Sequence, residues 1–264
     1  MLKQRIITGI LLFVVSVSCI MLGNPFTTLF FAVIVGAMAW EWDYMMNKGK
    51  STWLATVNAI TGAFCLFYPL AAGLILPFVV LAVVSVAVFF AAKRHKHGYP
   101  YLLAFGTVYI GFPALALNLI STVNTPYGIL LLFLLVWACD TGGYVFGCSI
   151  KGPKLCPAVS PNKTWAGFIG GLLLALAVVF AYDWYFDLRY KGLLVLTLGL
   201  GVIAQIGDLI ESAIKRHIGV KDSSNIISGH GGIFDRIDGL LLVVVVYAVL
   251  LFASDYGLIN MMIY

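Results

Sequence analysis

Long apolar stretches recur along the whole chain and are separated by short polar segments. A transmembrane helix needs roughly 20 mostly apolar residues to cross a bilayer. Nine stretches approach that length and leave no room for a soluble domain. They cover residues 5–22, 26–44, 54–70, 75–92, 103–122, 127–146, 165–182, 192–214 and 236–253. The pattern predicts an all-α polytopic membrane protein that forms one integral membrane domain over residues 1–264.

Composition and charge agree with this prediction. The chain is 62% hydrophobic and only 10% charged, whereas soluble domains carry about 25% charged residues. If nine spans alternate from a cytoplasmic N-terminus to an external C-terminus, only Arg189 and Lys191 of the 16 basic residues fall outside. Basic residues are expected to gather on the cytoplasmic side. The net charge of +5 is therefore explained by orientation, and we predict no nucleic-acid partner.

Acidic residues gather near the predicted cytoplasmic ends of the later spans. This group consists of Asp140, Asp208, Glu211, Asp222, Asp235 and Asp238. Asp208 lies about 24 Å from the external end of its helix at ~1.5 Å per residue. A carboxylate at that depth is costly and usually faces a polar cavity or a partner. Asp208, Glu211, Ser212 and Lys215 are spaced to share one helical face.

Two structural alternatives stay open for these acids. Asp208 could simply pair with Lys215 or Arg216. Glu41 and Asp43 close the second apolar stretch, and there we expect an ordinary charged helix end.

The stretch "KDSSNIISGHGGIFDRID", residues 221–238, combines charge with glycine. Asp235 and Asp238 are three residues apart, so they suit the first turn of a helix, where the dipole favours carboxylates. Gly231 and Gly232 can bring bare backbone N–H groups close to a phosphate at that helix N-terminus. Asp208 and Asp235 would together bind Mg²⁺, which prefers oxygen ligands. The stretch therefore predicts a site for a phosphate and its metal ion.

A second polar segment covers residues 140–167 and is rich in Gly, Pro and Lys. Gly and Pro favour a loop here. Its lysines could clamp a polyphosphate, or they could only follow the orientation rule. Lys163, in "SPNKTWAG" at a predicted helix start, is the strongest phosphate-binding candidate among them.

Residues 212–238 resemble the signature of the phosphatidate cytidylyltransferases, also called CDP-diacylglycerol synthases. "GD" at residues 207–208, "DTGGYVFG" and "SPNKTWAG" are also similar to this family. The resemblance is detailed over the predicted catalytic half, about 127–254, and rests only on apolar helices over about 1–122. Ser228 and Ala166 depart from the family pattern, so Ala166 is given no role. The signature positions matched are Ser212, Lys215, Arg216, Lys221, Asp222, His230, Gly231, Gly232, Asp235, Arg236 and Asp238.

The resemblance implies that CTP and phosphatidic acid give CDP-diacylglycerol and pyrophosphate in phospholipid biosynthesis at a bacterial inner membrane. It implies that Mg²⁺ is the cofactor, bound by Asp208 and Asp235, with Ser212 and Asp238 completing that centre or a second cation site beside it. The implied catalytic residues are Asp208, Asp235, Asp238, Lys215 and Arg236. The implied substrate-binding residues are Lys163, Arg216, Lys221, Asp222, His230, Gly231, Gly232 and Asp140.

Several roles stay open within that assignment. Asp222 either orients Lys221 or binds metal, His230 either contacts a phosphate or supports its loop, and Asp140 either contacts nucleotide or caps its loop. A homo-oligomer is one possible assembly. The competing function is an ion-coupled membrane transporter, which also places acids inside a membrane. Transporter sites tend to lie near the bilayer midplane, whereas these acids crowd one face.

Overall fold

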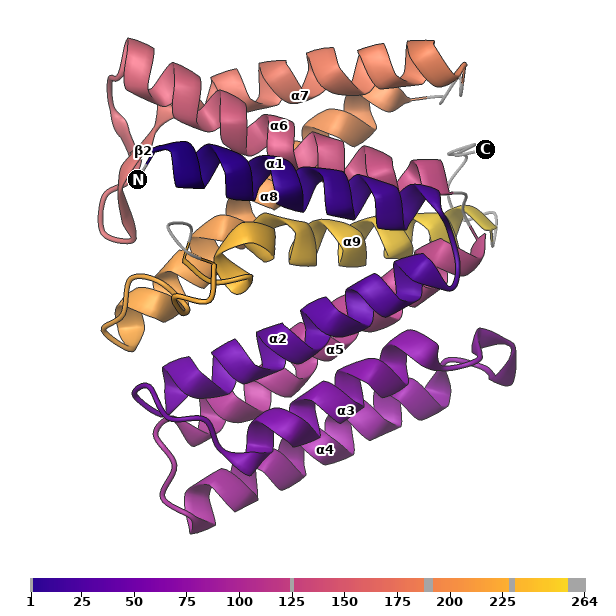
Figure 1. The fold of residues 1–264 in the computed structure, drawn as a ribbon, viewed down its shortest axis with the longest axis vertical. Helices are drawn as coiled ribbons and strands as arrows, with labels where there is room; N and C mark the ends of the chain where they lie inside the picture. The colour runs from indigo at the N-terminus through magenta and orange to yellow at the C-terminus, as the bar shows by residue number, and fades with distance from the viewer. Residues whose placement is uncertain (1, 124–125, 188–191, 228–230, 256–264) are drawn as a thin grey trace. The chain divides into compact units, whose positions relative to one another are not determined.

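The computed structural model describes residues 2–123, 126–187, 192–227 and 231–255. Helices dominate this part of the chain, together with one short 3-10 turn and one β-hairpin (Figure 1). The α-helices are α1 (Leu2–Met21), α2 (Phe26–Met46), α3 (Trp53–Phe67), α4 (Ile75–Arg94), α5 (Pro100–Val123), α6 (Pro126–Ile150), α7 (Trp165–Phe186), α8 (Leu193–His217) and α9 (Phe234–Asp255). Each predicted apolar stretch overlaps one of these helices, so the prediction of an all-α polytopic membrane protein is confirmed.

Helix length separates two groups among the described residues. Seven helices are long and apolar enough to cross a membrane, whereas α3 and the Thr8–Met21 part of α1 form shorter apolar helices. Pro69 follows the end of α3, and the chain then makes the 3-10 turn η1 (Leu70–Ala72). Proline has no N–H to continue a helix. The count of nine spans and the orientation of the termini stay predictions.

The loop expected over residues 140–167 is wrong in its first part. Helix α6 continues to Ile150, and only then does the chain form a hairpin of β1 (Lys154–Cys156) and β2 (Ser160–Thr164). The glycines of "DTGGYVFG" lie inside α6, where they allow close helix packing. Thr164 ends the hairpin and caps α7, because its Oγ1 accepts a hydrogen bond from Gly167 N at 3.1 Å.

The chain forms two compact units, and their boundary falls inside α9. The first unit contains Met1–Pro126 and Ile218–Ile237, and the second contains Tyr127–His217 and Asp238–Tyr264. The predicted signature segment is thus divided: most of it packs with the N-terminal helices.

In the first unit, α2, α3 and α5 pack against one another, and α4 packs along α5 and α3 (Figure 1). Trp42 is fully buried among them, and its Nε1 donates to the Leu102 carbonyl oxygen at 2.9 Å. The ring of Phe234, the first residue of α9, lies 5.4 Å from the ring of Trp42. A Cβ on Gly106 would collide with the Trp42 indole. A close helix approach and an aromatic cluster therefore hold the start of α9 in this unit.

In the second unit, α6 and α7 run side by side (Figure 1), and glycines on both helices allow the approach. A Cβ on Gly142 would lie 2.7 Å from the Gly170 carbonyl oxygen, and one on Gly171 would lie 2.6 Å from the Cys139 carbonyl oxygen. Small residues of this kind let membrane helices meet backbone to backbone. The close contact fixes where α6 stands beside the start of α7 and the hairpin.

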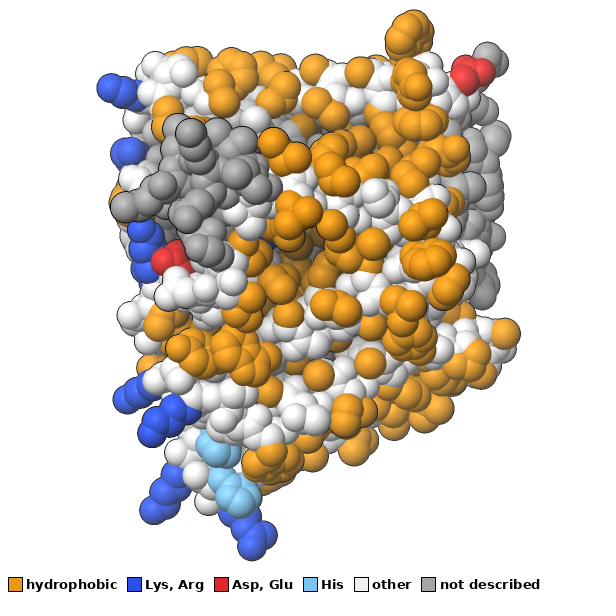
Figure 2. Space-filling model, in the orientation of Figure 1, with side chains coloured by type: hydrophobic (Ala, Val, Ile, Leu, Met, Phe, Trp, Pro, Cys, Tyr) orange, Lys and Arg blue, Asp and Glu red, His pale blue; other side chains and the backbone are white. Residues whose placement is uncertain are grey.

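Hydrophobic side chains are spread widely over the molecular face drawn in Figure 2. Large apolar residues are exposed on helices of both units, such as Val33 at 71% and Val195 at 72%. Soluble monomers rarely expose large contiguous apolar surfaces, which mark contact with a membrane or a partner. Lipid is therefore the environment that these helices require.

We predict that Gly171→Ala lowers the free energy of unfolding by about 1–3 kcal/mol, because overpacking a close contact costs that much. The measurement is the unfolding midpoint of purified protein in detergent. Gly199→Ala in α8 is the matched control, since a Cβ there meets nothing within 4 Å and alanine favours helix. Equal midpoints for the two variants would contradict the packing account.

Candidate functional site

Two acidic residues of the second unit meet where α8 crosses the part of α9 that belongs to it. A Cβ on Gly207 would lie 3.0 Å from the Asp238 carbonyl oxygen, and one on Gly239 would lie 3.0 Å from the Ala204 carbonyl oxygen. The backbones therefore touch at Gly207 and Gly239. Asp208 and Asp238 are the chain neighbours of these glycines, and the charge of Asp208 acts on Asp238.

Asp208 has partners from two directions. Lys163 Nζ, at the end of the hairpin, lies 2.5 Å from Asp208 Oδ2, and both side chains are partly exposed. Ser212 Oγ, one turn along α8, donates to Asp208 Oδ1 at 3.3 Å. The ion pair that Asp208 makes here is with Lys163, a residue outside the alternative that named Lys215 or Arg216. The structure brings together Lys163, Asp208 and Ser212, three of the predicted site residues.

A second ion pair lies further along α8, toward its C-terminal end. Lys215 Nζ is 2.5 Å from Glu211 Oε2, and both residues are buried. The charges of Asp208, Glu211 and Asp140 all act on Asp238, whose Oδ1 also accepts from Gly239 N at 2.8 Å. Several like charges in an apolar unit repel one another strongly unless cations offset them. Lys163 and Lys215 supply two of those cations.

Asp235 occupies the first turn of α9 in the first unit, as the sequence predicts, whereas Asp238, expected in the same turn, lies beyond it. Ser223 N donates to both of its oxygens, at 3.2 Å to Oδ1 and 3.0 Å to Oδ2, and Gly232 N donates to Oδ2 at 2.9 Å. Gly231 has φ +81, a conformation that glycine adopts without strain. These contacts fix the Asp235 carboxylate against the loop that precedes it.

The expectation of an ordinary charged helix end at Glu41 and Asp43 is wrong, because both residues are 0% exposed. Glu41 accepts four hydrogen bonds from the signature segment, as described below. Asp43 accepts from Asn47 Nδ2 at 3.0 Å, from Thr52 Oγ1 at 2.8 Å and from Thr52 N. Asp43 therefore holds the turn that begins α3.

Sequence reasoning missed the role of Glu41 although a signal was present. The residue stands between Trp40 and Trp42 in the run "AMAWEWDYMM". An acid flanked by large apolar side chains inside a membrane-type helix is costly unless it has a defined partner. Its partners lie about 180 residues further along the chain, so the sequence alone could not name them.

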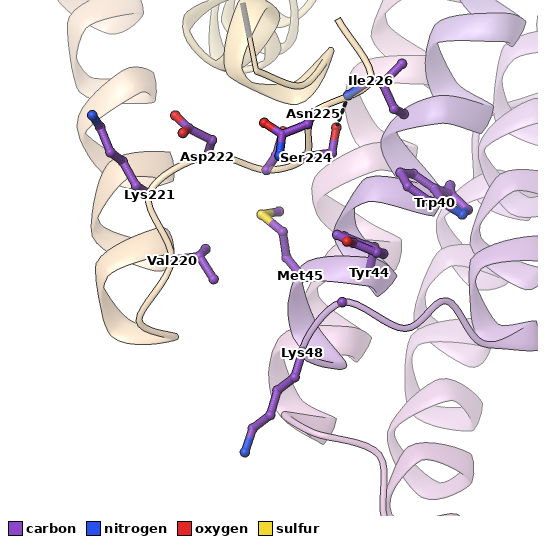
Figure 3. A pocket seen from close by; sticks show the side chains of 12 residues that line it. Trp40, Tyr44, Met45, Lys48, Val220, Lys221, Asp222, Ser224, Asn225 and Ile226 are labelled. Carbon is purple, nitrogen blue, oxygen red and sulfur yellow. Dashed lines mark hydrogen bonds between the residues drawn. The ribbon is translucent and has the colours of Figure 1, made fainter. Parts of the chain in front are cut away.

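A cavity of about 540 Å³ opens in the first unit beside the signature segment (Figure 3). Trp40 and Tyr44 of α2 stand on one side with their rings stacked 4.9 Å apart, and Lys221 and Asp222 stand on the other. This volume lies within the range usual for small-molecule sites, about 300–1,000 Å³. The lining residues are Trp40, Tyr44, Met45, Lys48, Gly49, Val220, Lys221, Asp222, Ser223, Ser224, Asn225 and Ile226.

The predicted site residues not yet described are mostly exposed. Asp140, Arg216 and Arg236 are exposed, as are the cavity residues Lys221 and Asp222. His230 lies outside the described residues, so its role stays a prediction.

The predicted metal centre divides between the units, with Asp235 in the first and Asp208, Ser212 and Asp238 in the second. Within the described ranges, no group of three or more His, Cys, Asp or Glu side chains is gathered to hold a metal ion by itself. Carboxylate and hydroxyl oxygens are ligand types that Mg²⁺ takes, together with waters and substrate phosphates, and the metal centre stays a prediction.

Comparison with known proteins gives one consistent family. The pattern that defines the cytidylyltransferase family matches residues 3–254. A phosphatidate cytidylyltransferase from Pseudomonas aeruginosa is 35% identical over 269 residues, which cover 97% of this chain and 99% of the relative. Proteins of the same name from Brucella suis and Bacillus subtilis are 36% and 34% identical, covering 91% and 92% of this chain and 89% and 94% of each relative.

We predict that Lys215→Met lowers the free energy of unfolding by about 3–5 kcal/mol, because it leaves Glu211 as a buried charge without its cation. Titration of purified protein with denaturing detergent measures this change. Arg216→Met, one residue further and exposed, should change stability little. A Lys215→Met variant as stable as Arg216→Met would show that the buried pair does not stabilise α8.

Proposed function

The chain belongs to the cytidylyltransferase family, and we propose that it transfers the cytidylyl group of CTP to phosphatidate. The products are CDP-diacylglycerol and pyrophosphate. The relatives that carry the name phosphatidate cytidylyltransferase match the chain over nearly their whole length. The resemblance recognised in the signature segment is thereby confirmed, and the transporter alternative gains no support.

One observation of the structure supports this chemistry most directly: acids and bases meet around Asp208 inside an otherwise apolar unit. Lys163 and Ser212 contact Asp208, and the charge of Asp208 acts on Asp238. Both reactants are anions, so bringing them together requires groups that offset charge and groups that hold phosphates. Preorganised electrostatics of this kind is the main contribution that proteins make to phosphoryl transfer.

The proposed reaction needs no covalent intermediate. An oxygen of the phosphatidate phosphate attacks the α-phosphorus of CTP and forms a new P–O bond. The bond from that phosphorus to the bridging oxygen of the β-phosphate breaks, and pyrophosphate leaves with the electron pair. Lys163, Lys215, Arg216, Lys221 and Arg236 are the proposed phosphate-binding residues. Their task is to hold the two phosphate groups in line.

Mg²⁺ is the proposed cofactor, and Asp208 and Asp235 would hold it, with Ser212 and Asp238 in the same centre or beside a second cation. When bound, the ion would supply a Lewis acid for the α-phosphoryl oxygens and offset charge on the departing pyrophosphate. Crowding of Asp208, Glu211 and Asp140 around Asp238 supports a need for further positive charge at this place.

The cavity in the first unit supports binding of a nucleotide next to the signature segment. Lys48 and Lys221 provide positive charge at its lining, Asn225 provides an amide, and the Trp40–Tyr44 pair provides a flat aromatic surface (Figure 3). A triphosphate with a planar base presents matching groups. We place CTP there in the proposed function.

The membrane supplies the second substrate. The chain is an integral membrane protein, and its relatives include bacterial enzymes. We propose that it lies in the inner membrane with the site facing the cytoplasm, which supplies CTP. The distribution of Lys and Arg supports this orientation. A homo-oligomer stays a prediction.

We predict that Asp208→Ala and Asp235→Ala each abolish formation of CDP-diacylglycerol while membrane insertion continues, because each removes a proposed metal ligand. The measurement is transfer of labelled cytidylyl from CTP into lipid by purified protein in phosphatidate-containing liposomes with Mg²⁺.

Asp183→Asn in α7 is the control, since Asp183 lies on the predicted external side. It should keep wild-type activity. Full activity in Asp208→Ala or in Asp235→Ala would overturn the assignment of that residue to the metal centre.

A further inference from the structure

The buried carboxylate of Glu41 contacts the signature segment at four points. Its Oε1 accepts from Ser224 Oγ at 2.5 Å and from Ile233 N at 2.9 Å. Its Oε2 accepts from Ser223 Oγ at 3.0 Å and from Phe234 N at 2.7 Å. Each oxygen thus receives one hydroxyl and one backbone N–H. All four described donors are neutral, and all lie between residues 223 and 234.

This arrangement explains how a carboxylate is tolerated in the core. A buried charge is costly unless hydrogen bonds replace its water shell, and here four donors do so. Phe234 is the first residue of α9, and the first N–H groups of a helix have no partner within it. The positive end of the helix dipole also favours a nearby anion. A side chain of α2 therefore caps α9, although the two elements are far apart in sequence.

The same contacts reach Asp235 through Ser223. The Ser223 hydroxyl lies 3.0 Å from Glu41 Oε2 and 3.1 Å from Asp235 Oδ2, and the Ser223 backbone N–H donates to the Asp235 carboxylate. Gly232 is packed against the same group: a Cβ there would lie 2.5 Å and 2.7 Å from the two Glu41 oxygens. Glu41 thus fixes the backbone on both sides of the loop that holds Asp235.

We infer that Glu41 is a positioning residue for the proposed cytidylyl transfer, acting through Ser223 and the start of α9 to hold Asp235 and one wall of the cavity. Ser223 and Ser224 line that cavity, and both hydroxyls reach Glu41. The inference rests on the proposed function, because it assigns Glu41 a role in cytidylyl transfer. It gives Glu41 no contact with substrate. It predicts that the charge of Glu41 matters for turnover beyond its effect on folding.

Glu41→Gln tests this inference with little change of shape. The amide has one oxygen and one NH₂, so whichever way it turns, Ile233 N or Phe234 N faces a donor instead of an acceptor. We expect kcat/KM to fall roughly 10- to 100-fold, as it does when a residue that orients a metal ligand is lost. The fall should appear mainly in kcat. In the protein without substrates, hydrogen exchange of a peptide covering residues 231–237 should become faster.

Asn118→Ala in α5 is the control, because Asn118 is also buried in the first unit but donates to the Cys65 and Tyr68 carbonyl oxygens, and none of these three residues lines the cavity. It should lose thermal stability while keeping kcat/KM and the exchange of residues 231–237. Ser224→Ala removes one donor and leaves the carboxylate in place. Its kcat/KM should lie between those of wild type and Glu41→Gln, so the inference remains testable if Glu41→Gln does not fold.

Wild-type kcat/KM in Glu41→Gln, or an equal loss in Asn118→Ala, would overturn the positioning role. If Glu41→Gln does not fold, Ser224→Ala takes its place. An unchanged kcat/KM in Ser224→Ala would then overturn the positioning role. Should the wild type fail to transfer label from CTP, the proposed function fails instead. The exchange comparison then still decides whether Glu41 holds the segment, since unchanged exchange would show that it does not.

Discussion

Buried carboxylates need donors or cations, and this requirement organises the polar interior of both units. In the first unit Glu41 is satisfied by four neutral donors, which tie the signature segment to α2. In the second unit Asp208 and Glu211 are satisfied by Lys163 and Lys215. In a chain with so few charges, the contacts of Glu41 and of Asp208 hold a helix end and the hairpin in place, whereas the Glu211–Lys215 pair offsets a buried charge within α8.

Glycine makes these contacts possible. Gly232 lets the loop approach Glu41, and Gly207 and Gly239 let α8 and α9 touch beside Asp208 and Asp238. A glycine pattern can therefore mean helix packing as well as a flexible or phosphate-binding turn. In each unit, close contacts of the glycine backbone determine where the neighbouring acidic side chains lie. Sites held in this way are preorganised for charged substrates.

Apolar length predicted the helices well, because bilayer thickness fixes how long such a stretch must be. Glycine and proline content was misleading at residues 140–150, where it suggested a loop, because these residues are helical and their glycines serve helix packing. Charge spacing on α8 correctly placed Asp208 and Ser212 on one face. It could not show that Lys163 is the partner of Asp208, or that Ser223 and Ser224 bind Glu41. Those contacts join residues far apart in sequence and arise only from tertiary packing.

The central claim is that this membrane protein moves a cytidylyl group onto a lipid phosphate. The most direct measurement supplies purified protein in phosphatidate liposomes with CTP labelled at either the α- or the γ-phosphorus. The account predicts that the α label enters lipid and that the γ label leaves as pyrophosphate. The γ label entering lipid, or neither label entering it while the protein is folded, would contradict the account.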